Sequence, residues 1–474
     1  MFAHMRYRTL ACDYDSTLAK DGAVNQETYD ALVRLKESGR RLLLVTGREL
    51  DDLFRVFPGV EVFDRVVAEN GALVYDPATK KSKTLGEKPP DAFVAALKKR
   101  EIAPLSVGQV IISTWHPNEV AVMKIIQQLG LELQIVFNKG AVMILPAGVN
   151  KATGMAEALR DLKLSFHNVV AIGDAENDHA FLKMAELSVA VSNALPMVKE
   201  TADLVTARSH GAGVVEIIDL MLSNDLATVS ELVKRQQLEI GRTAQGSGVC
   251  IAPYATNVLV AGASGGSKTT LATSFLERLI QKEYQFCIND PEGDYSELEG
   301  VVAYGDSQQS PNLEGLLSTL EKPNQNVVAS LLAVPMEDRP AYFEKLLLGL
   351  QDLRSRYSRP HWIIINEPHH LLPEAWRPTA IESRWPLQNL FLITADPESV
   401  SQTALSLIDA FVVIGKSVNA RVESFAKIAG RRLSVPVEIP ADLEAGEALL
   451  WRVTVDTDPV LFQFVLPRGG GTQD

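Results

Sequence analysis

The sequence predicts an α/β protein that has two parallel-sheet domains and a smaller α+β module inserted in the first. The chain has 474 residues, which is long enough for more than one domain. In the first half, three short apolar runs each end in polar residues and alternate with helix-like segments. In the second half, an apolar run leads into a glycine-rich stretch and then a helix. Both patterns are typical of parallel sheets that bind ligands at the carboxyl ends of their strands.

Composition narrows the class of protein further. A hydrophobic content of 46% suits well-packed cores, and a formal charge of −13 disfavours a broad nucleic-acid-binding surface. Cys12, Cys250 and Cys287 are widely spaced, which fits a reducing compartment rather than a disulfide framework. No apolar run approaches the roughly 20 residues that span a bilayer, and the first strand begins too early to leave room for a signal peptide. We therefore expect a cytoplasmic protein without membrane contact.

An acidic pair follows the first apolar run, which covers residues 10–12. Asp13 and Asp15 are separated by one residue, and in an extended backbone that residue points to the opposite side, so both carboxylates can share a cleft. The pair indicates a nucleophile beside its acid/base partner, and it could hold one Mg²⁺ through oxygen ligands. Two acids at a strand end can also be loop caps or solvated surface groups, so the pair needs support from other motifs.

That support comes from the ends of the next apolar runs. Asn25 is a candidate cap for a helix that ends near Ser38, and the strand after it leads into Thr46, Gly47 and Arg48. Lys151 opens a later helix, and the strand over 169–172 leads into the acidic stretch 173–178, which contains Asp174, Asn177 and Asp178. Taken alone, Lys151 could be an exposed helix-start lysine and Thr46 an ordinary cap. Together they place polar residues at the carboxyl ends of three strands.

Between these motifs lies an insertion of roughly 70 residues, long enough for a small module with its own core. The lysine- and proline-marked stretch over residues 80–90 reads as a polar exit from the first domain. Helices are expected near 91–100 and 117–129, and strands over 107–114, 131–137 and 141–145. Trp115, His116 and Asn118 lie at a strand end and could face the cleft, although ordinary surface loop residues are the alternative.

In this order and spacing the motifs resemble the haloacid dehalogenase (HAD) superfamily of phosphotransferases, and residues 68–72 resemble its Cof-type, or IIB, branch. The resemblance covers roughly the first half of the chain. It implies a Rossmann-like HAD core over residues 1–75 and 149–222. It also implies a C2-type α+β cap over residues 76–148, which covers the active site and selects the substrate.

The resemblance also implies roles for individual residues. Asp13 would attack phosphorus and form an aspartyl-phosphate, and Asp15 would protonate the leaving alcohol and later activate water. The catalytic residues would be Asp13, Asp15, Thr46 and Lys151. The phosphate ligands would be Thr46, Gly47, Arg48, Lys151 and Asn177. The Mg²⁺ ligands would be Asp13, Asp15, Asp174 and Asp178. The substrate would be a small phosphorylated metabolite, with a sugar phosphate as the first choice.

The second half begins after a connecting helix or linker over residues 223–246. A strand over 257–261 runs into Gly262 and a glycine-rich stretch that is nearly a P-loop, with Lys268 and Thr269 placed to reach phosphate and Mg²⁺. Ser267 is a departure, because it stands where the P-loop pattern has glycine. A glycine-rich turn before a helix is the plain alternative.

Two later stretches, residues 289–295 and the strand with an acidic end over 361–370, resemble HerA/FtsK-type P-loop ATPases. The resemblance implies an α/β P-loop NTPase domain over 247–474, with ATP as a candidate ligand and Glu367 as a candidate base. Asn366 departs from the aspartate that normally helps to hold Mg²⁺, and residues 394–395 lack the usual polar sensor. The nucleotide-binding candidates are Gly262, Gly265, Gly266, Ser267, Lys268, Thr269, Thr270 and Glu367.

Two functions therefore compete. In the first, the chain is a Mg²⁺-dependent phosphatase whose second domain binds a nucleotide for regulation or assembly. In the second, it is a nucleotide-driven, nucleic-acid-associated motor that carries an accessory phosphatase. The intact hydrolase motifs, set against the altered ATPase motifs, favour the first. HerA-type relatives form rings, so a homo-oligomer is a further expectation by analogy of fold.

Overall fold

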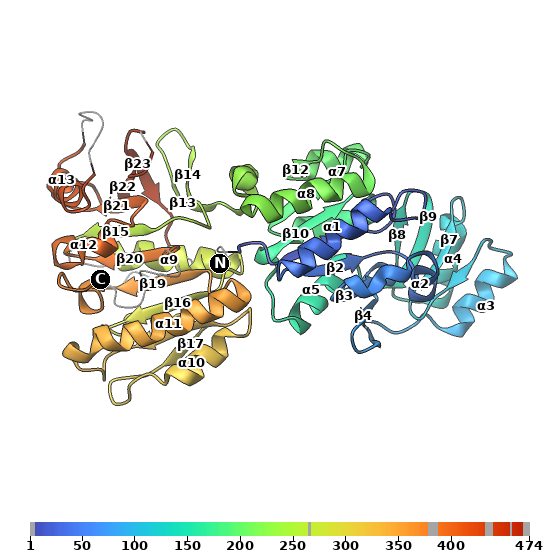
Figure 1. Ribbon diagram of the computed structural model, residues 1–474, viewed down its shortest axis with the longest axis horizontal. Helices are drawn as coiled ribbons and strands as arrows, with labels where there is room; N and C mark the ends of the chain where they lie inside the picture. Colours follow the sequence, from blue (N-terminus) through green and yellow to red (C-terminus); the bar gives the residue numbers. More distant parts are fainter. Residues whose placement is uncertain (1–4, 264–266, 378–386, 432–438, 456, 468–474) are drawn as a thin grey trace. The chain divides into compact units, whose positions relative to one another are not determined.

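The computed structural model describes residues 5–263, 267–377, 387–431, 439–455 and 457–467, with backbone alone at 230–232 (Figure 1). The chain divides into two compact units, Met1–Lys234 and Arg235–Asp474. Within the described residues, none of the helices is long and apolar enough to cross a membrane.

An eight-stranded sheet forms the centre of the first unit, in the order β12-β11-β10-β1-β2-β3-β4-β5. Neighbours from β12 to β3 are parallel, whereas β4 and β5 return antiparallel. The strands are β1 (Thr9–Cys12), β2 (Arg41–Val45), β3 (Arg65–Ala68), β4 (Leu73–Asp76), β5 (Lys81–Thr84), β10 (Val169–Gly173), β11 (Leu187–Ala190) and β12 (Leu204–Val205). The α/β fold expected for this half is confirmed.

Helices cover both faces of this sheet. They are α1 (Gln26–Glu37), α2 (Leu50–Val56), α5 (Lys151–Asp161), α6 (His179–Met184), α7 (Pro196–Thr201) and α8 (His210–Asn224). The N-cap predicted at Asn25 is confirmed, because its side chain accepts a hydrogen bond from the Thr28 amide. α1 packs beside α8 (Figure 1), whereas α5 packs on β2, β3 and α6. The near-continuous apolar runs of β1, β2 and β10 are buried on both faces, as central parallel strands require.

The lysine-rich stretch after β4 differs from the expectation. It was read as a polar exit, but Lys81–Thr84 forms β5, which pairs with β4 at the edge of the main sheet. All four of its residues are exposed. Charged residues are a common protection for an edge strand, so their polarity marks an edge rather than a loop. The cap therefore begins after β5, and the name is kept below for residues 85–148.

The cap holds a four-stranded antiparallel sheet, in the order β6-β7-β9-β8, and two helices. Its elements are α3 (Asp91–Lys99), β6 (Ser106–Val107), β7 (Ile112–Trp115), α4 (Glu119–Leu129), β8 (Leu133–Asn138) and β9 (Ala141–Pro146). Phe93, Leu97, Val122 and Ile125 from the helices form a core with the sheet. The single strand expected over 107–114 divides in two, because the amides of residues 109–111 bond to the Glu69 carboxylate instead of a neighbouring strand.

The turn that leads out of β3 lies close against the point where the chain returns from the cap. Gly71 has φ +102, and a Cβ added there would lie 1.9 Å from the Asn150 carbonyl oxygen. Only glycine fits both the backbone angle and this approach. The neighbouring Asn150 caps α5, since its side chain accepts from the amides of Ala152 and Thr153. The turn 69–71 and the start of α5 are therefore held together.

The second unit has one eleven-stranded sheet, in the order β14-β13-β23-β22-β21-β15-β20-β19-β16-β18-β17. Neighbours from β21 to β17 are parallel and the remaining pairs are antiparallel. The strands are β13 (Leu238–Arg242), β14 (Gly248–Ile251), β15 (Val258–Gly262), β16 (Phe286–Asp290), β17 (Val301–Tyr304), β18 (Asn326–Ser330), β19 (Trp362–Asn366), β20 (Leu390–Thr394), β21 (Ala410–Ile414), β22 (Glu447–Arg452) and β23 (Val460–Phe464).

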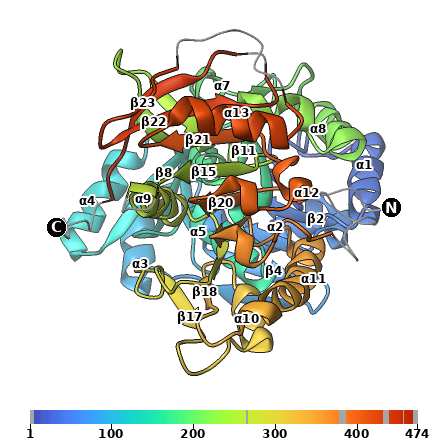
Figure 2. The ribbon, with the colours of Figure 1, turned by 90° about the vertical axis from the view of Figure 1, so that its left-hand side faces the viewer.

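Successive residues of β15 belong to different cores, as a strand buried on both faces requires. Val258 and Val260 pack with residues of α9, whereas Leu259 and Ala261 pack with residues of the other helices. Figure 2, which turns this unit towards the viewer, shows α10 and α11 lying together. The helices are α9 (Ser267–Gln281), α10 (Leu313–Leu320), α11 (Arg339–Tyr357), α12 (Gln402–Leu405) and α13 (Val418–Ile428).

The connector between the units is not the single helix expected from residue 223. α8 ends at Asn224, because Asp225 and Leu226 have positive φ angles of 52° and 61° and cannot continue a helix. Two short 3-10 turns follow, over Ala227–Leu232 and Lys234–Gln236. β13 then pairs with β14 and β23, so part of the predicted linker 223–246 belongs to the second sheet.

Candidate active site

Three buried carboxylates meet at the carboxyl edge of the first sheet. Asp13 follows β1 directly, and its amide donates to the Ile172 carbonyl of β10 at 3.0 Å. β10 delivers Asp174, and the turn after it delivers Asp178. One oxygen from each of Asp13, Asp174 and Asp178 lies within 4.8 Å of the others. The parallel pairing of β1 with β10 therefore brings together residues that are about 160 positions apart in the chain.

Lys151 lies inside this group. Its Nζ is 2.5 Å from Asp13 Oδ1 and 2.6 Å from Asp178 Oδ1, and its side chain is 1% exposed. This burial rules out the alternative of an exposed helix-start lysine. Burial lowers the pKa of Lys151, but the two carboxylates outweigh that effect and hold the pKa above its ordinary value.

The negative charge of the group exceeds what Lys151 alone can balance. Burial raises the pKa of Asp13, Asp178 raises it further, and Lys151 opposes the shift. Burial also raises the pKa of Asp174, against hydrogen bonds from Lys139 and Thr17. A divalent cation would relieve this repulsion, and carboxylate oxygens are the ligands that Mg²⁺ prefers. Asp13, Asp174 and Asp178 therefore fit a magnesium site.

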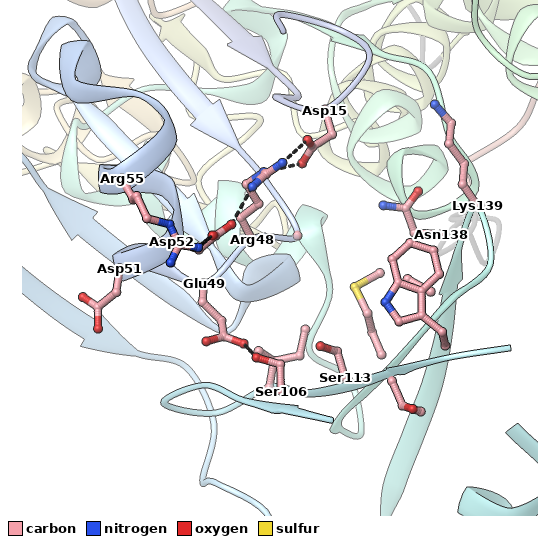
Figure 3. A pocket seen from close by; sticks show the side chains of 16 residues that line it. Asp15, Arg48, Glu49, Asp51, Asp52, Arg55, Ser106, Ser113, Asn138 and Lys139 are labelled. Carbon is pink, nitrogen blue, oxygen red and sulfur yellow. Dashed lines mark hydrogen bonds and ion pairs between the residues drawn. The ribbon is translucent and has the colours of Figure 1, made fainter. Parts of the chain in front are cut away.

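Asp15 lies outside the group of three. Both its oxygens accept from Arg48, at 2.8 Å from Nε and 2.7 Å from Nη2, while Nη1 of Arg48 donates to Asp52 at 2.5 Å (Figure 3). The hydrogen bond to Asp15 is the largest of the effects that raise the pKa of Arg48. Because the Asp15 side chain is 40% exposed, it borders the open pocket rather than the buried site.

The loop after β2 and the loop after β10 complete the centre. Thr46 is fully buried, and its hydroxyl accepts from the Arg48 amide at 3.1 Å. A Cβ at Gly47 would lie 3.5 Å from the Met143 sulfur of the cap and 3.6 Å from Asn177 Nδ2, so this glycine sits where the cap lies against the core. Asn177 is buried and donates to Asn70 Oδ1 at 3.0 Å.

Two residues that sequence reasoning missed also touch Asp174. Thr17 Oγ1 donates to Asp174 Oδ1 at 3.0 Å, and the Lys139 ammonium pairs with the other oxygen. Thr17 follows the acidic pair in the chain, so its position was a signal that could have been used. Lys139 gave no signal, because it lies in the turn between β8 and β9 and only the folded cap carries it to the core.

A pocket of about 740 Å³ lies between cap and core (Figure 3). Of the three residues that could face the cleft or be ordinary surface loop residues, Trp115 lines the pocket, whereas His116 and Asn118 do not. His116 is exposed and pairs with Glu119, and Asn118 donates to Thr114 and to the Ala103 carbonyl. The lining residues are Asp15, Gly47, Arg48, Glu49, Asp51, Asp52, Arg55, Ser106, Ile111, Ser113, Thr114, Trp115, Asn138, Lys139, Ala141 and Met143.

In the second unit, Gly262 ends β15 and α9 begins at Ser267. Ser264 and the predicted phosphate-loop residues Gly265 and Gly266 lie outside the described residues. Lys268 is buried and its Nζ donates to the Ala263 carbonyl at 3.0 Å, whereas Ser267 is exposed and Thr269 and Thr270 are half-buried. Burial lowers the pKa of Lys268, although nearby Glu367 opposes the shift.

Glu367 follows β19 and is held from the neighbouring strand β20. Its Oε2 accepts from the Thr394 hydroxyl at 3.1 Å and from the Ala395 amide at 3.3 Å. Asn366 beside it donates to Asp290 at 3.3 Å and to Asp294 at 3.1 Å. His369, which lies 3.6 Å from Glu367, and His370 belong to no metal-ligating group among the described residues. The carboxyl ends of β15, β20, β19 and β16 therefore gather polar residues at one edge.

A parallel sheet with aspartates at the carboxyl ends of its strands and a buried lysine beside them is an arrangement typical of α/β proteins that transfer phosphoryl groups. Within that class, the first half of the chain belongs to the haloacid dehalogenase-like hydrolase family. The family pattern matches residues 10–108 and 106–218. This half of the chain is accordingly a phosphatase.

Curated relatives match the same half. The chain is 30% identical to phosphoglycolate phosphatase 2 of Saccharolobus solfataricus over 46% of this chain and 93% of the relative. It is 29% identical to a phosphoglycolate phosphatase of Methanothermobacter thermautotrophicus over 44% of this chain and 97% of the relative. A crystal structure of a haloacid dehalogenase-like hydrolase from Bacteroides thetaiotaomicron aligns with 19% identity and a TM-score of 0.40, over 45% of this chain and 99% of that one.

Proposed function

We propose that the first unit is a Mg²⁺-dependent phosphomonoester hydrolase that works through an aspartyl-phosphate on Asp13. The contact of Lys151 with Asp13 at 2.5 Å, buried from water, supports the proposal most. A phosphomonoester is an anion, so a carboxylate can approach its phosphorus only where cations neutralise the charge between them. Lys151 supplies one such cation. Magnesium, once bound to Asp13, Asp174 and Asp178, would supply the rest of the charge neutralisation.

In the first step, a carboxylate oxygen of Asp13 forms a bond to phosphorus while the bond from phosphorus to the leaving oxygen breaks. The Asp15 carboxyl, in its protonated form, gives its proton to the leaving oxygen, so that an alcohol departs. Asp15 borders the pocket, and one of the two oxygens that Arg48 holds must leave the guanidinium to carry the proton. Thr46 and Asn177 lie beside the centre as candidate phosphoryl ligands.

In the second step, water attacks the phosphorus of the aspartyl-phosphate. The Asp15 carboxylate takes a proton from that water, the bond between Asp13 and phosphorus breaks, and inorganic phosphate leaves. Asp13 is restored as a carboxylate and Asp15 as a carboxyl group. Lys151 stays paired with Asp178 through both steps, and it pairs with Asp13 before the attack and again once the carboxylate is restored.

We propose a sugar phosphate as the substrate. The relatives named above are phosphoglycolate phosphatases, and phosphoglycolate carries a second anion. The pocket is lined by carboxylates and hydroxyls that can accept from or donate to sugar hydroxyls, and the Trp115 ring can pack on a sugar face. The cations in its lining, Arg48, Arg55 and Lys139, are each paired with a carboxylate. A volume of about 740 Å³ also exceeds what a two-carbon acid fills. The carboxylates in question are Glu49, Asp51 and Asp52.

Phosphate release from a panel of sugar phosphates and 2-phosphoglycolate, measured with and without Mg²⁺, tests the proposal. We expect Mg²⁺-dependent turnover that prefers a sugar phosphate and is lost in Asp13→Asn, while Lys268→Ala in the second unit leaves it unchanged. Turnover that survives in Asp13→Asn would refute the aspartyl-phosphate. A preference for 2-phosphoglycolate would refute the substrate class alone.

We also propose that the second unit binds a nucleotide such as ATP, in the manner of HerA/FtsK-type ATPases. Lys268 at the start of α9 and Glu367 at the end of β19, with opposite charges close enough to shift the Lys268 pKa, support this candidate. ATP binding that is lost in Lys268→Ala tests it. DNA-stimulated ATP turnover lost in Glu367→Ala would favour the alternative of a motor that carries a phosphatase.

A further inference from the structure

Glu69 is a buried carboxylate to which the steps proposed above assign no role. It lies at the end of β3 and is 1% exposed, yet no cation pairs with it among the ion pairs of the described residues. A buried carboxylate without a cation needs several hydrogen-bond donors to compensate for lost hydration. Glu69 therefore must be bound by groups brought to it from elsewhere in the fold.

The donors come from the cap. Glu69 Oε1 accepts from the Gln109 amide at 2.8 Å, and Oε2 accepts from the Val110 and Ile111 amides at 2.7 and 2.9 Å. These three amides belong to the loop between β6 and β7, where the cap sheet leaves them without strand partners. One side chain of the core thus accepts hydrogen bonds from three consecutive backbone amides of a cap loop. Hydrogen bonds to a charged acceptor are about twice as strong as neutral ones.

The space around the carboxylate is fitted to it. A Cβ added at Gly108 would lie 2.8 Å from Glu69 Oε1 and 2.9 Å from the Ile111 side chain, so residue 108 must be glycine for the loop to close on Glu69. Ile111 lines the pocket, and β7 continues from it to Ser113 and Trp115, which line the pocket too. The contact with Glu69 therefore fixes one wall of the pocket.

The backbone of the same turn holds the reaction centre. The Glu69 amide donates to the Arg48 carbonyl at 2.8 Å, and the Asn70 amide donates to the Thr46 carbonyl at 3.0 Å. The Asn70 side chain accepts from Asn177, which ties in the loop after β10. Glu69 and Asn70 both have positive φ angles, of 52° and 54°, in a region that costs free energy for residues other than glycine. Surrounding contacts must hold this turn in place.

We propose that Glu69 is a positioning residue that sets the cap wall of the pocket against the phosphate-binding loops. Its side chain fixes the loop over residues 108–111, and its backbone fixes the loop that carries Thr46 and Arg48. A substrate large enough to touch Ile111 and Trp115 is then held in one orientation relative to the reacting groups. This inference rests on the phosphatase activity proposed above, and it adds a determinant of specificity to it.

Glu69→Gln tests the proposal, because glutamine keeps the shape but its amide nitrogen cannot accept a hydrogen bond. We expect the catalytic efficiency, kcat/KM, to fall about tenfold or more for the best sugar phosphate, the range that pocket contacts supply. For acetyl phosphate, which is too small to reach the cap wall, we expect less than about a twofold change. Gly108→Ala should act in the same direction, because its Cβ displaces the carboxylate.

Glu186→Gln is the matched control. Glu186 is also a fully buried glutamate of the first unit, but it pairs with Arg6 and His167, which do not line the pocket. We expect this variant to change kcat/KM for the sugar phosphate and for acetyl phosphate by the same factor. The relevant quantity is the ratio of kcat/KM for the sugar phosphate to kcat/KM for acetyl phosphate. The proposal would be wrong if Glu69→Gln left this ratio unchanged, or if Glu186→Gln lowered it as much as Glu69→Gln does.

Hydrogen exchange of the amides of Gln109, Val110 and Ile111 gives a second readout that does not need activity. We expect exchange to accelerate about ten- to a hundredfold in Glu69→Gln, since such hydrogen bonds are worth that factor, and to stay unchanged in Glu186→Gln. If the exchange rates of these amides were unchanged in Glu69→Gln, the proposed positioning role of Glu69 would be wrong. If the wild type released no phosphate from any ester, the proposed function would be wrong. The exchange rates would still show whether the Glu69 side chain holds the loop over residues 108–111.

Discussion

Replacing Lys151 with methionine should cost the first unit a large part of its stability. The ammonium lies 2.5 and 2.6 Å from two carboxylates, and all three groups are buried. Methionine keeps most of the side-chain volume but leaves Asp13 and Asp178 facing each other without a cation. Removing one partner of a buried ion pair costs about 3–5 kcal/mol. We therefore expect Lys151→Met to lower the free energy of unfolding of this unit by about that amount near neutral pH.

The cost should depend on pH in a definite direction. Burial already raises the pKa of Asp13 above its ordinary value, and Asp178 raises it further. Lys151 opposes this shift, so its removal should raise the pKa of Asp13 further. A carboxyl group with a raised folded-state pKa destabilises the fold once it ionises, and the penalty disappears as pH falls below that pKa. The difference in the free energy of unfolding between wild type and variant should therefore be largest at alkaline pH and should narrow as the pH falls towards the ordinary carboxyl range.

The free energy of unfolding of this unit can be measured in the whole chain by urea unfolding, with hydrogen exchange of peptides from residues 5–229 as the probe. Lys83→Met is the matched control, because Lys83 pairs with Glu157 at 2.6 Å but is 61% exposed. Such a surface pair is worth about 0–1 kcal/mol. A loss in Lys151→Met no larger than the loss in the control, or a loss that is independent of pH, would refute the account of the buried group.

Three further predictions concern the same site. Asp174→Asn should weaken Mg²⁺ binding at least about tenfold in calorimetry, because it removes one of three carboxylates; equal affinity would exclude the site. Lys139→Met should tighten Mg²⁺ binding, since its ammonium must leave Asp174 before a cation binds there; weaker binding would contradict this. Arg48→Lys should lower kcat about tenfold or more for alkyl phosphates but little for p-nitrophenyl phosphate, whose leaving group needs no proton from Asp15.

The ends of the central strands could be predicted from sequence because each is a local pattern. An apolar run followed by polar residues marks the carboxyl end of a buried parallel strand, and the fold class of the first half is confirmed on that basis. The convergence of Asp13 and Asp174 follows from the pairing of β1 with β10, whereas Lys151 reaches them from the start of α5. The roles proposed for these residues stay predictions.

The cap contacts could not be predicted in this way. Lys139 reaches Asp174 only through the turn between β8 and β9, and Glu69 accepts from amides about 40 residues away in the chain. Both residues directly follow a strand, β3 and β8, but no local pattern says which distant groups each side chain will meet. Local reading also failed at β5, where edge-strand lysines look like a loop, and after Asn224, where two positive φ angles end a helix that composition alone would continue. In each of these places tertiary structure outweighs local sequence preference.

Because Gly71 packs against the Asn150 carbonyl, substitutions at positions 71 and 150 are not independent of each other. The cap is an insertion, and insertions can be exchanged between related proteins when the joints at both ends are compatible. Here the turn at Gly71, which precedes β4 and β5, touches the point where the chain returns from the cap, and Lys151 follows that point directly. A graft of a foreign cap would keep Lys151 in place only if positions 71 and 150 were transferred or retained as a pair. Chimaeras cut between them should lose activity even when both halves fold.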